Sequence, residues 1–485
     1  MTTFVSELSP RELWQHFDRI LATPRPSKSE ARLRDQIREL AREHKLEIGI
    51  DTFGNAAVRL PATPGHEPAA TVVLQSHLDM VGEKNAGVDF DFTKDAIVPR
   101  REGDWLYATG TTLGSDNGIG VAAMLALLDA PGVVHGPLEL LFTLEEEIGL
   151  NGAAALDPRL VTGRTLLNLD TEEEGALYVG CAGGAGSELR VPLDRMFGAE
   201  GRMALAVELG GLKGGHSGVD IHLQRGNAIA ILARALWAVA ESSGLEVASF
   251  EGGNLTNAIP REARAVVRVA PEARAEFEAA LAGELSAARD ELAPVDPGLE
   301  WKISAVEFDG EVWADATAER VLALLAALPH GVVRTSDDIA DLVETSTNLA
   351  RVRTEPGRLL LSISNRSSVE SALAAEQRRT AAFGALAGAE VVVEEGYPGW
   401  KPNPDSKLLA LVERVHERTL GSKPAVKAIH AGLECGILGE RLPGSDMISF
   451  GPQIEHPHSP DERVSISSVE RFWRLLTATL AELAT

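Results

Sequence analysis

The sequence has few cysteines, and their placement excludes a disulfide-stapled fold. Cys181 and Cys435 are the two cysteines in the chain. They have no CxxC spacing and no disulfide framework, which is typical of a reducing compartment. Each lies beside glycine in an apolar context, so we expect two small buried thiols.

Basic residues are also scarce relative to acidic ones. Lys and Arg total 46 against 71 Asp and Glu, which gives a formal net charge of −25. A chain this acidic is repelled by phosphate backbones and by anionic lipid surfaces. The sequence therefore predicts neither nucleic acid nor membrane as a partner, and it favours a cation as the ligand.

Long apolar runs are absent. No stretch reaches the roughly eighteen residues that a membrane helix requires, and the first residues, "MTTFVSELSPRELWQHF", lack the basic and apolar regions of a signal peptide. We therefore expect a cytoplasmic protein. At 485 residues the chain is long enough for two or more domains.

The first part of the chain alternates strand and helix signals. Short apolar runs of the buried-strand kind are separated by segments with helical spacing. This order predicts an α/β catalytic domain with a mostly parallel sheet flanked by helices, whose ligands gather at the carboxyl ends of the strands. The expected strands are residues 56–60, 71–75, 138–143 and 165–169.

The pattern of predicted strands and helices changes after the glycines at 180–184. Longer alternating segments and amphipathic helices follow, and this pattern is repeated once, which indicates an inserted α+β lid domain with two lobes. A Pro- and Gly-rich stretch, "GYPGWKPNPDSK", marks the return. We predict a discontinuous catalytic domain, residues 1–184 plus 397–485, and a lid or substrate-binding domain, residues 185–396.

Metal-ligand residue types follow several predicted strands. His77 and Asp79 are two residues apart and share one side of an extended chain. Asp116 lies in a glycine-rich turn, Asp170 ends another strand, and His458 follows "DMISFGP". Imidazoles mixed with carboxylates suit zinc, manganese or cobalt better than magnesium or calcium, which prefer oxygen alone.

The segment "LEEEIG" places three consecutive glutamates, Glu145, Glu146 and Glu147, at a strand end. Neighbouring carboxylates repel one another, so a positive centre is expected opposite them. A lone histidine at a strand end is usually a satisfied polar residue, and a lone aspartate before glycine is usually a turn former. The combination favours a metal site, but the residues alone leave the roles of the ligands open.

Nine motifs together resemble the di-zinc M20 metallopeptidases, and within them the aminoacyl-histidine dipeptidase branch. The similarity runs in order over nearly the whole chain, from "PRPSKSE" to "HSPDE". The motifs are "SHLDM", "LGSDNGIG", "EEEIG", "LLNLDTEEEG", "GCAGG", "GGHSG", "NAIPREA", "HAGLECG" and "HSPDE".

The resemblance implies a set of metal ligands. Asp116 is expected to bridge two divalent ions, most readily zinc, with manganese or cobalt as alternatives. His77 and Asp170 would complete one coordination shell, and Glu147 and His458 the other.

Two further carboxylates receive catalytic roles from the same resemblance. Glu146 would be the general base that takes a proton from the attacking water. Asp79 would hydrogen-bond His77 and fix its tautomer without binding metal itself.

The insert carries three of the four candidate substrate residues, and the fourth, Gly432, lies in the returning catalytic segment. The resemblance assigns His216 as a donor to the substrate carbonyl, and a surface-loop histidine is the alternative. Asn257 and Arg366 are expected to bind substrate, with Arg366 holding the terminal carboxylate; a structural ion pair is the rival role for Arg366. Gly432 would let the backbone approach the peptide closely.

Some residues stay unassigned or depart from the family pattern. Ser115 occupies a position where alanine is expected, and His456 could face the same way as His458. His430 and Glu434 are candidates to hold the ends of a dipeptide. The acidic groups at 172–174 and 461–462 are interpreted as solvated or capping charges.

The resemblance predicts a metal-dependent dipeptidase of small unblocked peptides, with Xaa-His dipeptides among the candidates. A deacylase of N-acyl amino acids would use the same metal centre, and a non-catalytic peptide-binding protein of the same fold is a rival of another class. The expected partner is a small peptide, and a homodimer is one assembly that the resemblance allows.

Overall fold

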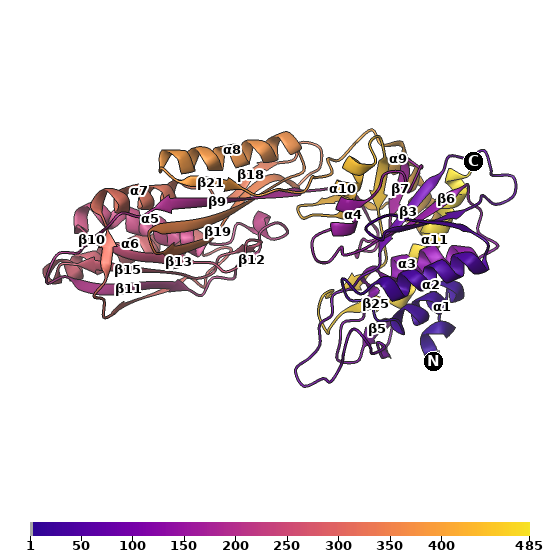
Figure 1. The fold of residues 1–485 in the computed structure, drawn as a ribbon, viewed down its shortest axis with the longest axis horizontal. Coiled ribbons are helices and arrows are strands. Elements are labelled where there is room, and N and C mark those ends of the chain that lie inside the picture. The colour runs from indigo at the N-terminus through magenta and orange to yellow at the C-terminus, as the bar shows by residue number, and fades with distance from the viewer. Residues whose placement is uncertain (1–2) are drawn as a thin grey trace. The chain divides into compact units, whose positions relative to one another are not determined.

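The computed structural model describes residues 3–485, which divide into two compact units (Figure 1). Unit 1 comprises the described residues through Gly180 together with Trp400–Ala428 and Leu433–Thr485. Unit 2 comprises Cys181–Gly399 and the short segment Ile429–Gly432. The chain therefore leaves unit 1, builds unit 2 and returns.

Unit 1 is built around an eight-stranded mixed sheet. Its strands in spatial order are β1 (Glu47–Ile50), β2 (Ala56–Leu60), β6 (Leu138–Thr143), β3 (Val72–His77), β7 (Thr165–Asn168), β23 (Asp446–Ser449), β8 (Ala176–Cys181) and β22 (Ala425–Ile429).

Parallel strands form the centre of this sheet. β3 pairs in parallel with both β6 and β7, and β7 pairs in parallel with β23. Every residue of β3 and β6 is buried, which explains their continuous apolar sequences. Because the carboxyl ends of parallel strands meet at one edge, the residues that follow β3, β6 and β7 come together there.

Helices cover this sheet, and a smaller sheet lies beside it. α3 is buried along most of its length, as expected from its almost uniformly apolar sequence. The helices of unit 1 are η1 (Phe4–Glu7), α1 (Arg11–Leu21), α2 (Ala31–Glu43), α3 (Ser115–Asp129), α4 (Asn151–Ala155), α9 (Lys407–Leu420), α10 (Glu434–Arg441) and α11 (Ile466–Leu483). The smaller sheet is β24 (Ile454–Glu455), β25 (Arg463–Ser465), β5 (Trp105–Ala108) and β4 (Pro99–Glu102).

Unit 2 contains a nine-stranded antiparallel sheet made of two halves. The halves meet where β13 pairs with β19 through Gly252 and Val352. The strands in spatial order are β16 (Glu300–Ala305), β11 (Met203–Gly210), β15 (Ala263–Val269), β13 (Glu246–Gly252), β19 (Val343–Glu355), β20 (Arg358–Ser367), β9 (Gly183–Pro192) and β21 (Glu390–Val393), with β18 (Gly331–Thr335) also paired to β19.

Four helices pack on this sheet and enclose one continuous apolar core (Figure 1). The periodic leucines of the helices and the alternating apolar residues of the strands meet in that core. The helices are α5 (Ala228–Ser243), α6 (Arg274–Leu292), α7 (Asp315–Ala327) and α8 (Glu370–Leu386), with short turns η2 (Ile221–Leu223) and η3 (Pro271–Ala273). Two small ribbons complete the unit: β10 (Arg195–Phe197) with β17 (Glu311–Trp313), and β12 (Gly215–His216) with β14 (Ala258–Ile259).

The predicted fold class is confirmed. A parallel sheet centre flanked by helices occurs in unit 1, and an α+β arrangement occurs in unit 2. Both cysteines are buried, as expected. Among residues 3–485, no helix combines the length and the apolar character needed to cross a membrane.

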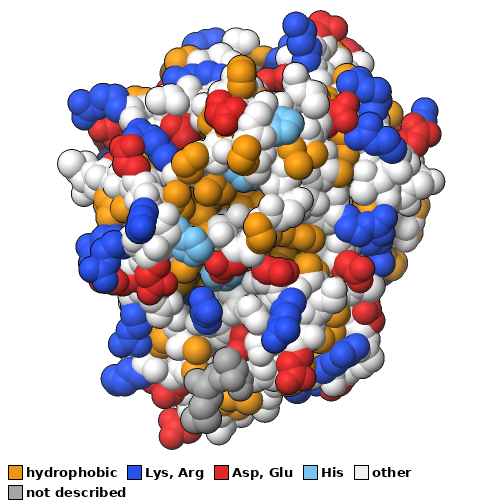
Figure 2. Space-filling model, turned by 90° about the vertical axis from the view of Figure 1, so that its right-hand side faces the viewer, with side chains coloured by type: hydrophobic (Ala, Val, Ile, Leu, Met, Phe, Trp, Pro, Cys, Tyr) orange, Lys and Arg blue, Asp and Glu red, His pale blue; other side chains and the backbone are white. Residues whose placement is uncertain are grey.

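Acidic and basic side chains alternate on the face drawn in Figure 2, and apolar side chains gather in a hollow near its middle. No continuous basic area covers this face. On this face, therefore, the acidic side chains lie among scattered basic side chains.

The core of unit 2 gives a matched test of packing. Leu281 is fully buried in α6, whereas Leu386 at the end of α8 is 84 % exposed. We expect Leu281→Ala to lower the free energy of unfolding of unit 2 by about 2–5 kcal/mol, and Leu386→Ala to change it by less than about 0.5 kcal/mol. Native-state hydrogen exchange of amides in unit 2 measures both values, and equal effects would contradict this description of the core.

Candidate metal centre

Metal-ligand side chains from several segments meet at the carboxyl edge of the parallel strands. His77 is the last residue of β3, and Asp170 follows β7 by two residues. Residues 145–147 follow β6, Asp116 lies at the start of α3, and His458 lies between β24 and β25. Residues nearly four hundred positions apart therefore share one site.

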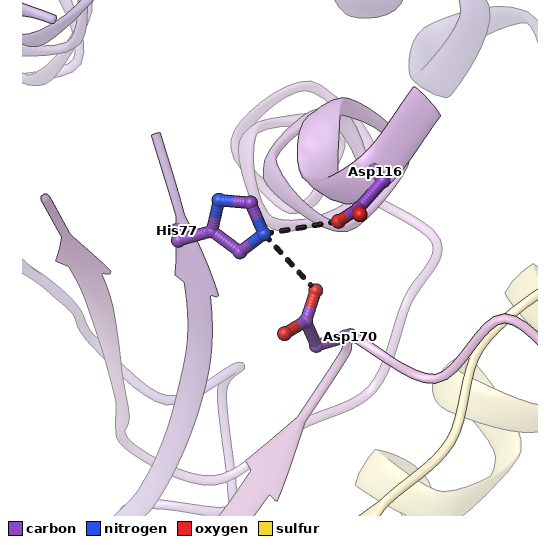
Figure 3. Close-up of side chains that lie close together, drawn as sticks. All are labelled: His77, Asp116 and Asp170. Atoms are coloured by element: carbon purple, nitrogen blue, oxygen red, sulfur yellow. Dashed lines mark hydrogen bonds and ion pairs between the residues drawn. The ribbon is translucent and has the colours of Figure 1, made fainter. Parts of the chain in front are cut away.

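Asp116 lies between two imidazoles. Its Oδ1 is 3.0 Å from Nε2 of His77, and its Oδ2 is 3.2 Å from Nε2 of His458. Nε2 of His77 is also 3.3 Å from Oδ1 of Asp170 (Figure 3). Nε2 of His458 is 2.9 Å from Oε2 of Glu147. The two oxygens of Asp116 thus face different histidines. Each histidine also lies beside a second carboxylate, Asp170 for His77 and Glu147 for His458.

The donor set fits divalent metal ions. Ligand atoms of three groups lie within 4.8 Å of one another, and the groups share members: His77 with Asp116 and Asp170, His77 with Glu146 and Glu147, and Asp116 with Glu147 and His458. Oε1 of Glu147 is buried and has no hydrogen-bond partner among the described residues, so a buried anionic oxygen is left for a cation. Nitrogen and oxygen donors together suit zinc, manganese or cobalt.

His456 is in none of these groups among the described residues, whereas His458 is in one of them. Both have positive φ, 55° for His456 and 59° for His458. A non-glycine residue adopts this conformation at some cost, and such strain is common at functional sites.

Carboxylates crowded around two imidazoles shift the pKa values of the side chains at this site. Hydrogen bonds to Asp116 and Glu147 raise the pKa of His458 to about 11. Burial raises the pKa of Asp170 to about 6, although His77 opposes this shift. Burial, followed by the carboxylates of Asp170 and Glu147, raises the pKa of Glu146 well above its usual value. The crowded carboxylates therefore favour the binding of a cation at this cluster.

Asp79 organises the site without joining a metal-binding group. Its Oδ1 lies 3.3 Å from Nδ1 of His77 and accepts the backbone N–H of Glu146 at 3.0 Å. Its Oδ2 accepts the N–H of Glu147 at 3.2 Å and the hydroxyl of Ser27 at 2.8 Å. One buried carboxylate therefore orients the imidazole and also fixes the backbone of two glutamates.

Glu145 is directed to different partners. Its N–H donates to Glu30, and its Oε2 accepts the side-chain amide of Asn151 at 3.0 Å. Its φ is +51°, which reverses the chain direction immediately before Glu146. The three consecutive glutamates are thus separated by backbone geometry.

Glu462 fixes the loop that carries Asp116, a role that the sequence interpretation recognised only as a general capping charge. Its carboxylate is buried and accepts the N–H groups of Leu113, Gly114 and Ser115 at 2.7–2.9 Å. The hydroxyl of Ser115 donates to the same carboxylate at 2.6 Å. Serine at the position where alanine was expected therefore contributes a bond to this anchor.

Arg25 fixes the same region from the other side. Its fully buried guanidinium donates to the carbonyl oxygens of Leu78 and Asp79 at 2.9 and 2.6 Å, and to that of Gly114. Gly114 has φ +72°, and a Cβ there would lie 2.7 Å from Nη2 of Arg25, so only glycine fits. The "PRP" sequence gave no signal of this role, because an arginine is rarely this buried.

Glu434 lies in the interior of unit 1, with no exposed surface. Its Oε2 accepts the amide of Gln75 at 2.5 Å and the hydroxyl of Thr143 at 2.9 Å. Burial raises its pKa to about 7. These contacts tie Oε2 of Glu434 to β3 and β6, whereas its buried Oε1 has no hydrogen-bond partner among the described residues.

Glu172 is also not a solvated charge. It is partly buried, and burial followed by the carboxylates of Asp116 and Asp170 raises its pKa to about 9. The next two glutamates do pair with surface cations, Glu173 with Lys427 and Glu174 with Arg471. The prediction of solvated charges was therefore wrong for Glu172, because its side chain lies beside the metal-ligand carboxylates.

In unit 2, His216 is held in one tautomer. Its Nδ1 accepts the N–H groups of Gly218 and Val219 at 3.2 and 3.0 Å, so the proton of the neutral ring is on Nε2. Burial, followed by the charge of Arg366, lowers the pKa of His216 and favours that neutral form. The Nε2–H is thus available as a donor.

Arg366 lies near His216, on the other side of Gly218. A Cβ on Gly218 would be 3.1 Å from Nε of Arg366, 3.1 Å from Cε1 of His216 and 2.2 Å from the carbonyl oxygen of His430. Nε2 of His430 is 2.7 Å from the hydroxyl of Ser346. Glycine at 218 lets these groups approach one another closely.

Arg366 also lines a cavity of about 260 Å³ together with Asn257 and Tyr397. Its Nη1 donates to the hydroxyl of Tyr397 at 2.9 Å, and its Nε has no hydrogen-bond partner among residues 3–485. Gly432 lies against the same tyrosine, since a Cβ there would be 2.8 Å from the ring. The arginine therefore retains donors for an anion.

Comparison with known proteins connects these features to a family. Residues 73–482 match the model described as peptidase family M20/M25/M40. The chain is 41 % identical over 479 residues to the cytosol non-specific dipeptidase of Escherichia coli, covering 99 % of each chain. It is also 41 % identical to the crystal structure of the aminoacylhistidine dipeptidase of Vibrio alginolyticus, with a TM-score of 0.94 and coverage of 99 % of this chain and 98 % of that one. The aminopeptidase PepT of Bacillus cereus, 17 % identical, shares the fold with a TM-score of 0.57 and coverage of 99 % and 100 %.

The anchor formed by Glu462 can be tested by removing its charge. In Glu462→Gln, the carboxamide cannot accept all of the bonds that hold the loop, so Asp116 should move and metal affinity should fall by about 10- to 100-fold. Competition with a chelating dye measures this affinity. Glu455→Gln is the matched control because Glu455 pairs with Arg463 at the surface, and identical affinities in the two variants would contradict the role of Glu462.

Proposed function

The chain belongs to peptidase family M20/M25/M40, and from this membership we propose that it is a metal-dependent dipeptidase, a hydrolase that cleaves small unblocked dipeptides. One observation carries the proposal: the carboxylate of Asp116 lies between His77 and His458, with a further acidic ligand beside each imidazole. This arrangement offers two adjacent cation sites that share one ligand.

We assign one cation to His77, Asp116 and Asp170, and the other to Asp116, Glu147 and His458. The ion expected at both positions is zinc, and the same donors would accept manganese or cobalt. When bound, such ions polarise a carbonyl and increase the acidity of water.

Glu146 acts as the general base in this proposal. Its carboxylate lies beside the ligand cluster, and the bond from its N–H to Asp79 holds its backbone. The carboxylate accepts a proton from the attacking water and donates it to the leaving amine. The opposing assignment, with Glu146 as a metal ligand, is separated from this one by the substitutions below.

His216, Asn257, Arg366 and Gly432 are proposed to act on the substrate. The Nε2–H of His216 would donate to the oxygen of the scissile carbonyl as negative charge develops there. The unpaired donors of Arg366 suit the terminal carboxylate of a dipeptide. Asn257 lines the cavity next to this arginine.

The names of the two relatives differ in how they describe the second residue of the substrate. One is called non-specific and the other is called an aminoacylhistidine dipeptidase. We propose that Xaa-His dipeptides are among the substrates of this chain. The name of the E. coli relative places that protein in the cytosol, and we propose the same compartment for this chain. The formation of a homodimer stays a prediction.

A substrate panel tests the proposed function. Protein loaded with zinc or manganese should hydrolyse Ala-His and Gly-Gly, and should leave an N-acetyl amino acid intact because that substrate lacks a free amine. Chelator-treated protein is the control. Turnover of the N-acetyl compound alone would assign a deacylase, and peptide binding without any turnover would assign a non-catalytic protein.

The three consecutive glutamates allow a matched set of variants. Glu146→Gln should lower kcat by about two to four orders of magnitude while two metal ions per chain remain bound. Glu147→Gln should lose metal, because a ligand is removed. Glu145→Gln is the control and should keep both metal and activity, since its side chain bonds Asn151. Metal analysis with steady-state kinetics measures these effects, and equal metal loss in the first two variants would refute the division of roles.

The role of His216 has its own test. His216→Ala should lower kcat by about two to three orders of magnitude with metal content unchanged, because a donor to the developing oxyanion is lost. His222→Ala is the control, since His222 is exposed in the same loop region. An unchanged rate for His216→Ala would return this residue to the role of a surface-loop histidine.

A further inference from the structure

A second cavity lies beside the metal-ligand cluster, entirely within unit 1. It has a volume of about 780 Å³, and Glu147 and Ile148 line it. This volume is in the range of small-molecule sites. Because Glu147 is one of the proposed metal ligands, an occupant of this cavity would lie next to the reacting bond.

Two aromatic rings form a wall of the cavity. Phe90 and Phe92 pack edge to face, with centroids 4.7 Å apart and planes at 63°. The Phe92 ring rests on the backbone at Gly82, where a Cβ would be 2.9 Å from the ring. Glycine at 82 therefore sets the position of this aromatic wall.

The loop that carries these rings is fixed by hydrogen bonds. Nζ of Lys84 donates to the carbonyl oxygen of Phe90 at 2.8 Å, and the N–H of Asn85 donates to Gly110 at 2.9 Å. Thr112 bonds Val81 and Glu83 with its hydroxyl and its N–H. A wall held in this way is preformed, so little conformational entropy is lost when a side chain binds.

Met80 and Ile148 add further apolar surface to the lining of the cavity. Met80 is buried, and Ile148 is 46 % exposed beside Glu147. The N–H groups of Gly149 and Leu150 both donate to the carbonyl oxygen of Glu146, which holds Ile148 in a tight turn. A large apolar side chain fixed in an exposed position next to a reactive centre offers surface to a ligand.

We propose that this cavity binds the side chain of the N-terminal residue of the dipeptide and selects large apolar side chains there. The inference rests on the proposed function. The carbonyl cleaved in a dipeptide belongs to its N-terminal residue, so the side chain of that residue projects from the atoms nearest the metal ligands. Glu147 and Ile148, being consecutive, connect the metal cluster to the apolar walls.

The charges at the cavity are mixed. Glu83, Asp91 and Glu147 line it together with Lys84, and Asp91 pairs with Lys94 at 2.5 Å. The selection therefore rests on the apolar walls, so leucine, methionine and phenylalanine should be preferred at the first position, then alanine, then glycine.

The test uses the metal-loaded full chain and dipeptides that differ in the first residue only. For Leu-Ala and Phe-Ala, kcat/KM should exceed that of Gly-Ala by about 10- to 100-fold. In both Phe92→Ala and Ile148→Ala, the ratio of kcat/KM for Phe-Ala over Gly-Ala should fall by about 5-fold or more. Phe92→Leu should keep most of the ratio, because it restores apolar surface.

Phe197→Ala is the control, since Phe197 is 83 % exposed on the β10 strand of unit 2. Circular dichroism and metal content show whether each variant is folded, and the exposure of Ile148 makes Ile148→Ala the safer substitution. Dipeptide hydrolysis with no preference at the first residue, or with a preference that both cavity variants leave unchanged, overturns the proposal. The proposal is also overturned if the cavity variants change the preference for the second residue of the dipeptide instead of the first. Absence of any dipeptide hydrolysis would refute the proposed function itself.

Discussion

The site depends on the position of one carboxylate, that of Asp116, between two imidazoles. Each of its oxygens faces a separate pair of side chains, so a small rotation would disturb both of the proposed cation positions at once. Two buried side chains of opposite charge prevent that rotation: Glu462 binds the amides that precede Asp116, and Arg25 binds the carbonyl of Gly114. A charge buried without a partner is costly, and here each charge is matched to backbone dipoles that the fold presents. The accuracy of the metal centre therefore comes from groups that touch no metal.

The same logic accounts for three glutamates in a row. Like charges at a strand end would separate if the backbone allowed it. Asp79 accepts the amides of Glu146 and Glu147, while Glu145, at positive φ, bonds Asn151. Backbone geometry thus assigns the three side chains to different surroundings before any ion binds. Burial, followed by the neighbouring carboxylates, raises the pKa of Glu146, and a bound cation would oppose that rise.

The fold class and the family could be predicted because their signals are local. β3 and β6 are continuous apolar runs that end at residues of ligand type, and the motifs occur in the family order. The anchors could not be predicted, because burial of Arg25 or Glu462 depends on partners far away in the sequence. For the same reason the prediction for Glu172 was wrong. A run of acidic residues is usually exposed to solvent, and the sequence does not show which distant segment covers this one. The tautomer of His216 depends on two backbone N–H groups in its own turn. The sequence does not show in which direction those N–H groups point, so the tautomer could not be predicted.

The bond network between Glu462 and residues 113–115 joins two segments that are about 350 positions apart in the chain. His458 comes from the same late segment. During synthesis, the strands that carry His77, Glu147 and Asp170 leave the ribosome long before either residue exists. A partial chain at that stage lacks His458 from one proposed set of ligands, and Arg25 alone holds the loop around Asp116, without Glu462. The proposed site is therefore complete only when the polypeptide is almost finished.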